Sequence, residues 1–448
     1  MSIKTVAIAT LGCKVNQYDS AALAALFARR GYRIVDFAEP ADVYVINTCT
    51  VTHIGDRKSR QLIRRAARNN PEAVIVVTGC YAQVAPGEAL AIPGVDLVVG
   101  MRERARIVDL IEKAASRPDG PRQAVRDVRA AGEFEELPAP AAAHERVRAF
   151  LKIQEGCNNY CTYCIVPYAR GPLKSRRPEK VLAEAEELIA AGFKEIVVTG
   201  IHTGAYGCDL PEKVNLAALL KELVQLPGLV RLRLSSVEPL DVSLELIATV
   251  AAHDRICPHL HIPLQSGDDA VLKRMNRHYT AEYFRGLVRE IRRNIPEAAL
   301  TTDVMVGFPG ETEEQFQNTY RFVQEMTFSR LHVFKYSPRK PTPAAKMPDQ
   351  IPAPVKEERS RLLIALGEEL ARSFAVRFLG REVEVLAEEP SREFPGHYEG
   401  LTGNYLRVIF PAAGCIRGEL VTVRVEELIG QNLHGKVVAL LQDLNNSC

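Results

Sequence analysis

Three cysteines, Cys157, Cys161 and Cys164, stand close together in the segment EGCNNYCTYCIVPYARG; we call them the first trio. Thiolates are soft ligands that select zinc or iron–sulfur clusters. A closed zinc site needs a fourth Cys or His, and none lies within the usual ligand spacing. A cluster of four irons would give each thiolate its own iron and leave one iron open. The spacing therefore favours an incompletely ligated iron–sulfur cluster over a zinc loop or unrelated thiols.

Three further cysteines, Cys13, Cys49 and Cys80, each follow an apolar run that reads as a β-strand: TVAIATLGC, DVYVINTC and AVIVVTGC. We call them the second trio. A single cysteine is usually a small buried apolar residue. The carboxyl ends of parallel strands, however, line one crevice, so three cysteines at equivalent strand ends are expected to converge. The pattern indicates a second ligand site.

The composition bounds the class of protein. Apolar residues make up 47% and charged residues 25%, as in ordinary soluble proteins. There is no apolar run of about 18 residues or more, and the opening MSIKTVAIAT does not resemble a signal peptide. We therefore expect a cytoplasmic protein without a membrane segment. Ten cysteines are too dilute for a disulfide scaffold. The net charge of +2 is uninformative, so an RNA site would have to be a local basic patch.

The elements that must position the cysteines belong to three regions. Strands and helices alternate at the start of the chain, which predicts a doubly wound parallel sheet. A second alternating series begins at Phe150 and predicts a partial (β/α)6 barrel of the TIM kind, with the first trio at the carboxyl end of its first strand. Short β-branched segments after Glu382 predict a small antiparallel β-barrel.

The expected domain boundaries follow from these patterns. A stretch rich in Ala, Pro, Arg and Glu has no steady period, which is typical of a linker or a loosely packed arm. The expected division is an N-terminal domain at 1–114, a linker at 115–148, a barrel domain at 149–375 and a C-terminal domain at 376–446.

Both trios resemble those of a known family. The loop of the first trio, with Tyr163 before its last cysteine, strongly resembles the radical S-adenosylmethionine (SAM) superfamily, in which the open iron of a 4Fe-4S cluster chelates SAM. The contexts TLGCKVNQYDS, VINTCTVT and VVTGCYAQ resemble the amino-terminal domain of the methylthiotransferases, whose cysteines hold a second 4Fe-4S cluster. RLRLSSVEP, LHIPLQSGDD and TTDVMVGFPGETEEQF extend the resemblance, and GLTGNYLRV resembles the TRAM domain, which is associated with RNA binding.

This resemblance implies a tRNA methylthiotransferase. GCKVNQYD and GIHTGAYG point to the branch that adds a methylthio group to carbon 2 of threonylcarbamoyladenosine, next to the anticodon. The implied cofactors are SAM and two 4Fe-4S clusters. The cluster of the first trio would generate a radical from SAM that abstracts the substrate hydrogen, and the cluster of the second trio would hold the sulfur to be methylated and delivered. The implied partners are a tRNA anticodon stem-loop, an external electron donor and a sulfur donor, and we expect a monomer.

Other functions stay open at this point. The same chemistry could act on isopentenyladenosine in tRNA or on a ribosomal-protein aspartate. An RNA-binding electron-transfer protein is a different class of alternative. Electron carriers normally ligate each cluster with four residues, which argues against that class.

Residues at the ends of the barrel strands are candidates for binding SAM. Glycine would let the backbone approach the ligand, and hydroxyl or carboxylate groups would bind ribose hydroxyls. Each could instead be an ordinary turn residue. Besides Tyr163, the candidates are Gly200, Ser235, Ser236, Glu238, Gln265, Gly307 and Phe308.

RNA contacts are expected where basic residues gather. The segment RKSRQLIRRAAR, residues 57–68, places cations on a predicted helix directly after the Cys49 strand, and phosphates favour such surfaces. Residues 174–180 and 273–279 are further basic candidates. Tyr405 and Arg407 could stack on or pair with RNA, with core packing an equal alternative for Tyr405.

Several remaining residues carry narrower expectations. Asp303 is expected to pair with a cation or accept hydrogen bonds, because an isolated buried carboxylate is costly. His202, His259 and His261 are interpreted as structural histidines, and Cys208, Cys257, Cys415 and Cys448 as ordinary thiols. The segment FKYSPRKPT departs from the family, with Lys335 in place of proline and Pro341 in place of glycine, so the shape of this loop is expected to differ.

Overall fold

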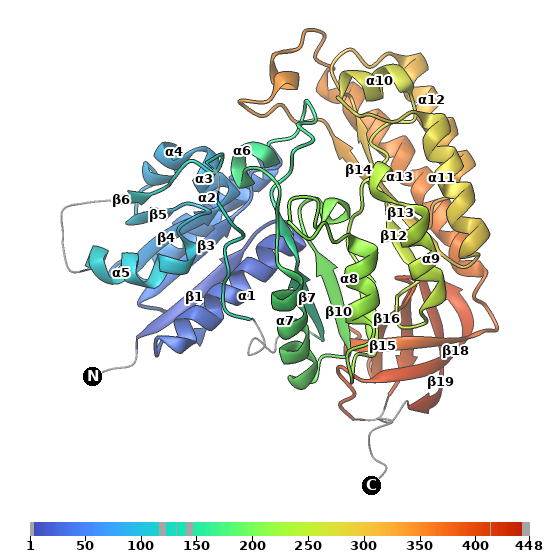
Figure 1. Ribbon diagram of the computed structural model, residues 1–448, viewed down its shortest axis with the longest axis horizontal. Coiled ribbons are helices and arrows are strands. Elements are labelled where there is room, and N and C mark those ends of the chain that lie inside the picture. Colours follow the sequence, from blue (N-terminus) through green and yellow to red (C-terminus); the bar gives the residue numbers. More distant parts are fainter. Residues whose placement is uncertain (1–3, 116–121, 131, 140–146, 413, 441–448) are drawn as a thin grey trace.

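The computed structural model describes residues 4–115, 122–130, 132–139, 147–412 and 414–440. Three regions succeed one another along the chain in Figure 1: a sheet with flanking helices (blue to cyan), a curved arrangement of strands inside a ring of helices (green to orange) and a small barrel (red). These are the three architectures that the sequence predicts.

The first region is a six-stranded parallel sheet of order β2-β1-β3-β4-β5-β6. Its strands are β1 (Thr5–Thr10), β2 (Arg33–Val35), β3 (Val43–Thr48), β4 (Val74–Gly79), β5 (Leu97–Val99) and β6 (Arg122–Ala124). Its helical segments are α1 (Lys14–Arg29), α2 (His53–Asn69), α3 (Cys80–Val84), α4 (Pro86–Leu90), η1 (Arg104–Arg106) and α5 (Ile107–Ala115). Tyr44 and Ile46 enter one apolar cluster, whereas Val43 and Val45 enter another. Alternate residues of β3 therefore fill cores on opposite faces, as the doubly wound prediction requires.

Part of the range expected to be a linker is ordered against the rest of the protein. β6 pairs with β5 and extends the sheet. Further along, Val128 and Leu137 are buried, and Glu136 forms an ion pair with Arg176. The Pro- and Ala-rich pattern predicts a loose arm. It cannot reveal these contacts, because the partner residues lie far away in the sequence. Residues 116–121, 131 and 140–146 of the range lie outside the described residues.

The second region is the predicted partial barrel. Its parallel strands are β7 (Arg148–Lys152), β10 (Glu195–Thr199), β11 (Arg231–Leu234), β12 (His259–His261), β13 (Ala299–Val306) and β14 (Arg330–Lys335). They form two three-stranded sheets, and bridges such as Ser236–His261 join the edges of these sheets. The outer helices are α7 (Pro178–Ala190), α8 (Leu216–Leu223), α9 (Leu244–Ala252), α10 (Asp269–Arg274), α11 (Ala281–Asn294) and α12 (Glu313–Met326). Shorter segments are β8 (Gln154–Glu155), α6 (Val166–Arg170), β9 (Lys174–Ser175), η2 (Thr203–Ala205), η3 (Pro239–Asp241) and η4 (Pro343–Lys346).

The strands of this barrel are apolar on one side and polar on the other. Ile196, Leu232 and Val304 belong to the large core shared with the outer helices. The intervening residues, such as Arg233 and Asp303, face the inside of the barrel, which we call the lumen. A polar lumen is unusual, because the interior of a packed barrel is usually filled by apolar side chains.

The third region is a closed barrel of order β15-β16-β17-β19-β18. Its strands are β15 (Glu382–Pro390), β16 (His397–Thr402), β17 (Arg407–Pro411), β18 (Leu420–Ile429) and β19 (Asn432–Leu440), and helix α13 (Ala353–Val376) leads into it. The prediction of a small β-barrel is confirmed. One neighbouring pair, β17 with β19, is parallel, and the other pairs are antiparallel.

The turn between β16 and β17 forms the floor of the lumen. The guanidinium carbon of Arg233 lies 3.9 Å from the centre of the Tyr405 ring. The same arginine donates hydrogen bonds to the carbonyl oxygens of Thr402, at 3.0 Å, and Gly403, at 2.6 Å. The His259 ring also packs on Tyr405. Tyr405 is therefore partly buried by packing on Arg233 and His259, while Arg407 is exposed and pairs with Glu399.

A buried ionic network joins the first region to the second. It comprises Asp19 of α1, Arg104, Lys152 of β7, Glu155 of β8 and Arg170 of α6, and we call it the junction network. Asp19 accepts contacts from Lys152 at 2.7 Å, Arg104 at 2.7 Å and Arg170 at 3.2 Å. Burial alone would raise the pKa of Asp19, but these three cations lower it below its ordinary value.

We predict that Asp19→Asn destabilises the protein by about 3–5 kcal/mol near neutral pH, because it leaves buried cations without a partner. Because folding lowers the pKa of Asp19, the stabilisation is complete above the unfolded pKa of about 3.9 and is lost as the pH falls below it. The difference between the urea midpoints of wild type and variant should therefore be constant from neutral pH to about pH 5 and shrink at lower pH. Asp109→Asn, which breaks a half-exposed pair with Arg30, is the control and should cost less than about 1 kcal/mol.

Candidate functional site

The second trio lies at the carboxyl ends of neighbouring strands. Cys13 follows β1 and caps α1, Cys49 follows β3 shortly before α2, and Cys80 follows β4 as the first residue of α3. The order β1-β3-β4 in the sheet makes these three strand ends adjacent. The convergence that the sequence predicts is therefore present.

Gly79 brings Cys80 against its neighbour. Its φ is +92°, and a Cβ at this position would lie 2.4 Å from the carbonyl oxygen of Thr48. Only glycine allows this approach between the ends of β3 and β4. The close contact places Cys80 beside Cys49, which directly follows Thr48.

The thiols of the second trio are close enough to influence one another. Burial, followed by the nearby Cys80 and Cys13 thiols, raises the pKa of Cys49 to about 11. Burial also raises the pKa of Cys80, and the Arg170 guanidinium beside it opposes that rise. Three thiolates here would repel one another unless a cationic group lay between them. Such a group is what a metal cluster provides.

The first trio occupies the loop between β8 and α6. The Cys161 thiol is buried and accepts a hydrogen bond from Arg277 at 3.4 Å. The Cys157 sulfur lies 3.7 Å from Nδ1 of His202 and accepts a hydrogen bond from the backbone N–H of Asn159 at 3.4 Å. Burial and the neighbouring Cys161 raise the pKa of Cys164 well above its ordinary value. The chemistry of this donor set is again that of an iron–sulfur cluster with thiolate ligands.

His202 has a more specific setting than a structural histidine requires. Its Nε2 lies 2.7 Å from Oδ2 of Asp241, while Nδ1 faces Cys157. Burial lowers the pKa of this imidazole, but the hydrogen bonds to Asp241 and Cys157 outweigh burial and raise it to about 10. The residue thus presents a cation to a thiol of the first trio.

Sequence reasoning did not assign the two buried arginines beside the trios to the cysteines: it placed Arg277 in a basic segment expected to contact RNA and gave Arg170 no role. Arg277 contacts Cys161 and forms an ion pair with Glu238, and Arg170 lies beside Cys80 in the junction network. Each is a cation buried next to thiols, which favours the thiolate form that binds metal. An arginine inside an otherwise buried stretch, as in PYARG, is the signal that could have revealed them.

The SAM candidates of the barrel lie at or shortly after the carboxyl ends of its strands. A Cβ on Gly200 would lie 3.0 Å from Cβ of Gln154, so this glycine lets the neighbouring strand ends approach. The hydroxyl of Ser235 lies 3.3 Å from that of Thr203, and Ser236 bridges to His261. The carboxylate of Glu238 is partly exposed beside Arg277.

The remaining candidates are held by the strand ends themselves. Gln265 has a φ of +65°, and its backbone pairs with β13. The backbone N–H of Gly307 donates to Glu311 at 2.7 Å. Phe308 is fully buried against Tyr336, and Tyr163 packs on the same cluster. Packing and backbone hydrogen bonds therefore fix these positions.

The histidines and the carboxylate of the lumen lie together on three strands. Oδ1 of Asp303 is 3.3 Å from Nε2 of His261 and 3.2 Å from Nδ1 of His332. The expectation that Asp303 accepts hydrogen bonds is confirmed. Nδ1 of His261 and Nε2 of His259 both lie within 3.0 Å of the Thr301 hydroxyl, which fixes the two rings.

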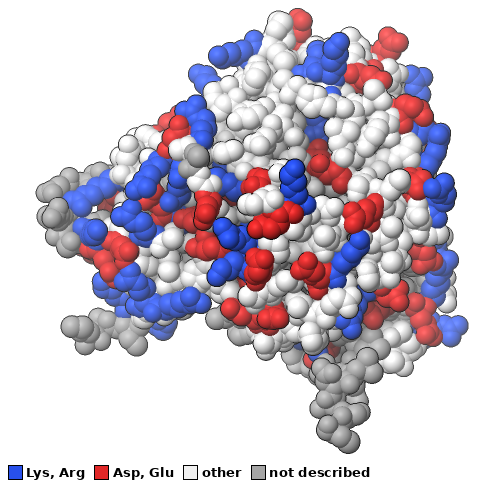
Figure 2. All heavy atoms as spheres, in the orientation of Figure 1, with Lys and Arg blue, Asp and Glu red and all other residues white. Residues whose placement is uncertain are grey.

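The basic segments differ in how much cation they expose. In segment 57–68, which lies within α2, Arg57, Lys58, Arg64 and Arg68 are exposed. Arg176 and Arg277, in the other two segments, are buried in ion pairs, so they are unavailable to RNA. Figure 2 shows basic and acidic side chains interspersed over the face in view, in keeping with the small net charge.

The loop after β14 ties the barrel to α2. Arg339 forms an ion pair with Asp56 at 2.6 Å and lies 3.0 Å from Nδ1 of His53. Lys335 pairs with Glu357 of α13, on the side of β14 away from the lumen, and the Lys340–Pro341 peptide bond is cis. The two departures from the family therefore fall on this connecting loop and its approach.

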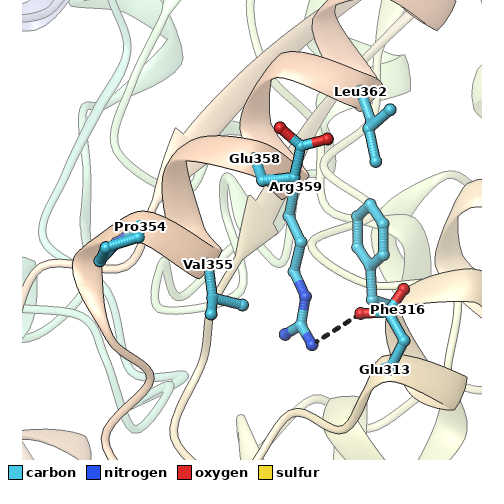
Figure 3. Close-up of a pocket in the computed structure, with 7 residues that line it drawn as sticks. All are labelled: Glu313, Phe316, Pro354, Val355, Glu358, Arg359 and Leu362. Atoms are coloured by element: carbon cyan, nitrogen blue, oxygen red, sulfur yellow. Dashed lines mark hydrogen bonds and ion pairs between the residues drawn. The ribbon is translucent and has the colours of Figure 1, made fainter.

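One well-formed pocket lies elsewhere. A pocket of about 360 Å³ opens between α12 and α13, where Arg359 reaches toward Glu313 beside Phe316 (Figure 3). Neither trio contributes to its lining. It is a groove between two outer helices and carries none of the predicted site residues.

Three family descriptions match consecutive parts of the chain. The radical SAM superfamily matches residues 151–323, the uncharacterized protein family UPF0004 matches residues 5–100, and the TRAM domain matches residues 376–438. The first two contain the first and second trios, respectively. Among the helices that the structure describes, none is long and apolar enough to cross a membrane.

Curated relatives match over almost the whole length. Threonylcarbamoyladenosine tRNA methylthiotransferase MtaB of Bacillus subtilis (strain 168) is 48% identical, with 98% of this chain and 97% of that protein covered. MtaB of Aquifex aeolicus is 41% identical, with 88% of this chain and 95% of that protein covered. tRNA-2-methylthio-N(6)-dimethylallyladenosine synthase of Moorella thermoacetica is 39% identical over 97% and 98%.

Solved structures share the fold. The radical SAM methyltransferase TsrM of Kitasatospora setae, solved with cobalamin and a [4Fe-4S] cluster, aligns with a TM-score of 0.58 and 17% identity over 77% of both chains. At this identity the likeness concerns the fold alone.

We predict that Gly79→Ala lowers the thermal midpoint and exposes Cys80. The added methyl group meets the Thr48 backbone and the positive φ strains the chain, which should together cost about 1–3 kcal/mol. The measurements are thermal denaturation and the rate of Cys80 alkylation, read by peptide mass spectrometry in the metal-free protein. Gly87→Ala is the matched control, because nothing lies within 4 Å of a Cβ there. Equal alkylation rates in Gly79→Ala and wild type would contradict the positioning role of Gly79.

Proposed function

This chain belongs to the radical SAM tRNA methylthiotransferase family, and from that premise we propose that it adds a methylthio group to carbon 2 of threonylcarbamoyladenosine in tRNA. Support for this branch comes from the relatives named for that substrate, the first of which is 48% identical, against 39% for the relative named for dimethylallyladenosine. The observation that carries the proposal is the presence of two cysteine trios, one on each side of a single buried junction.

The residues of each trio fit a 4Fe-4S cluster with one open iron. We propose that Cys157, Cys161 and Cys164 hold the cluster that binds SAM, near Tyr163 and the strand-end residues of the barrel. The second trio would hold the auxiliary cluster. Bound there, the clusters and SAM would supply the radical and sulfur chemistry that an unactivated aromatic C–H bond requires, since a general base cannot remove that hydrogen.

The residues around the clusters have roles of their own. His202 and Arg277 place positive charge beside the thiols of the first trio, and Arg170 does so for the second. These charges would offset the negative charge of a thiolate-bound cluster and so tune its reduction potential. The junction network holds the regions that carry the two trios in a fixed relation to each other.

RNA would be held outside this space. We propose that the exposed cations of α2 contact tRNA phosphates, because α2 begins at His53, shortly after Cys49. The C-terminal barrel, which matches the TRAM domain, supplies a second surface for RNA. An electron donor and a sulfur donor would complete the turnover.

The test of the substrate is nucleoside mass spectrometry of tRNA from cells with and without the gene. The methylthio derivative of threonylcarbamoyladenosine should disappear in the deletion strain and return with the wild-type gene. Loss of methylthio-isopentenyladenosine instead would overturn the branch. Unchanged tRNA with a changed ribosomal protein would overturn the RNA substrate.

We predict different defects for the two trios. Cys157→Ala should abolish SAM cleavage, whereas Cys80→Ala should retain cleavage and stop product formation. Each variant should lose about four irons per chain after reconstitution, since each removes a ligand from one cluster. Deoxyadenosine and modified nucleoside are measured in the same reaction. Cys415→Ala, in the C-terminal barrel, is the control and should match wild type in both measurements. Loss of cleavage in Cys80→Ala would contradict separate roles.

We predict that the double change Arg57→Ala and Lys58→Ala on α2 weakens tRNA binding. Removing one cation that binds a phosphate should reduce the slope of the logarithm of the affinity against the logarithm of the salt concentration by about one. Removing two should also reduce the affinity roughly tenfold at moderate salt. Fluorescence anisotropy at several salt concentrations provides the measurement. The paired change Arg289→Ala and Arg293→Ala on α11 removes the same charge elsewhere and should leave the slope unchanged. An unaltered slope in the α2 variant would place the RNA on another surface.

A further inference from the structure

A lysine above the floor of the lumen has no counter-ion among the residues that the structure describes. Lys14 directly follows Cys13 at the start of α1 and is half-buried. Its Nζ lies 5.7 Å from the centre of the Tyr405 ring, at the floor of the lumen. Within the described part of the chain, Lys14 has no ion pair and no hydrogen bond from its ammonium group. A half-buried ammonium group with no anion beside it is a site for an incoming anion.

The surroundings of Lys14 are positively charged. Burial lowers the pKa of His259 well below its ordinary value, and the charges of Arg233, His261, Lys14 and His332 lower it further. Arg233, His259 and Lys14 all lie against the Tyr405 ring, so they share one small region of the lumen. Arg233 itself is neutralised by Glu195, with 2.7 Å between Nε and Oε1. The charge of Lys14, in contrast, is not neutralised by any residue that the structure describes, so it is available to bind an anionic ligand.

Asp303 offers the complementary acceptor. Both of its histidine contacts go to Oδ1. In the structure as described, Oδ2 has no hydrogen-bond partner. The carboxylate is only partly exposed. Burial alone would raise its pKa, but the hydrogen bonds from the two imidazoles lower the pKa below its ordinary value, so the carboxylate stays ionised. Its free oxygen can accept one hydrogen bond from a hydroxyl or N–H group in the lumen.

The His261–Asp303–His332 cluster could also ligate a metal ion, since its ligand atoms lie within 4.8 Å of one another. The electrostatics of the lumen argue against this. A divalent cation would enter a lumen that already holds the ammonium group of Lys14 above the Tyr405 ring. Like charges repel strongly in a space of low dielectric constant. An anionic ligand with a hydroxyl group is favoured instead.

We propose that Lys14 binds the threonyl carboxylate of threonylcarbamoyladenosine and that Oδ2 of Asp303 accepts a hydrogen bond from the threonyl hydroxyl or carbamoyl N–H. This inference rests on the proposed function. Threonine joined through its amino nitrogen keeps a free carboxylate and a hydroxyl, whereas an isopentenyl group has neither. Lys14 is therefore a specificity-determining residue for this substrate.

The position of Lys14 suits the chemistry of the base. Carbon 2, which reacts, and carbon 6, whose amino nitrogen carries the threonylcarbamoyl group, flank the same ring nitrogen of adenine. A base whose carbon 2 faces Cys13 therefore carries its N6 substituent toward a neighbouring side chain. Phe334, 45% exposed, lies two residues beyond His332 on the same face of β14 and offers a surface for the ring.

The test uses full-length reconstituted protein and three versions of one anticodon stem-loop. One carries threonylcarbamoyladenosine, the second carries its methyl ester, and the third carries unmodified adenosine. Wild type should bind the first at least about tenfold more tightly than the other two, as a charge-assisted contact predicts. In Lys14→Gln the three affinities should fall within about twofold of one another, and Lys14→Arg should restore most of the preference.

A second variant tests the acceptor. Asp303→Asn should reduce the preference for threonylcarbamoyladenosine over unmodified adenosine by about two- to tenfold, the value of one hydrogen bond. Lys4→Gln is the matched control, because Lys4 also lies over a tyrosine ring, 5.8 Å from the centre of Tyr32, but on the surface. Iron content is measured throughout to verify that each variant is folded and loaded.

The outcomes separate the two ideas. If wild type does not prefer the threonylcarbamoyl stem-loop, the proposed function fails. If wild type has the preference and Lys14→Gln keeps it, the proposed function stands and this inference is overturned. A metal other than iron, present at about one per chain in wild type and absent from Asp303→Asn, would overturn the role of Asp303 as a ligand acceptor.

Discussion

The junction network is the constraint on which the rest of the site depends. Asp19 belongs to the sheet region, whereas Lys152, Glu155 and Arg170 belong to the barrel and its first loop. Buried ion pairs add little net stability, because desolvation offsets the attraction, but an unpaired member is costly. The two regions are therefore held in the one arrangement that pairs all these charges. Both cysteine trios are adjacent to this junction, since Arg170 acts on Cys80 and Glu155 lies two residues before Cys157.

Positive charge is distributed along the path from the junction to the lumen. Arg170, Arg277 and His202 lie beside thiols, and Lys14 lies farther in, above the floor. Thiolates, a cluster and a substrate carboxylate are all anionic, so the same physical need recurs at each step. The protein meets it with side chains fixed by carboxylates at their other ends, such as Asp241 for His202 and Glu238 for Arg277. Orientation is thereby set before any ligand arrives.

The sequence predicted the architecture and the two trios because both depend on local patterns. Strand ends, helix caps and short ligand spacings are encoded within a few residues. The partners of the cysteines could not be predicted in the same way: Arg277 lies 116 residues from Cys161, and Arg170 lies 151 residues from Asp19. A basic residue can lie either on the solvated surface or in a buried ion pair, and the sequence around it does not distinguish the two. Arg176 and Arg277 show that the fold alone decides between them. The contacts of residues 122–139 could not be predicted for the same reason, because acidic residues of this segment pair with arginines that are distant in the sequence.

The contacts of Tyr405 give the C-terminal barrel a second structural role. The lumen ends where this ring meets Arg233 and His259, so the final region of the chain closes the base of the central one. During synthesis the strands of the central barrel leave the ribosome before the turn that seals them. Until that turn docks, water has access to the lumen from below as well as from the mouth. Docking of the barrel that matches the TRAM domain therefore closes the lower route for solvent, while the mouth stays open.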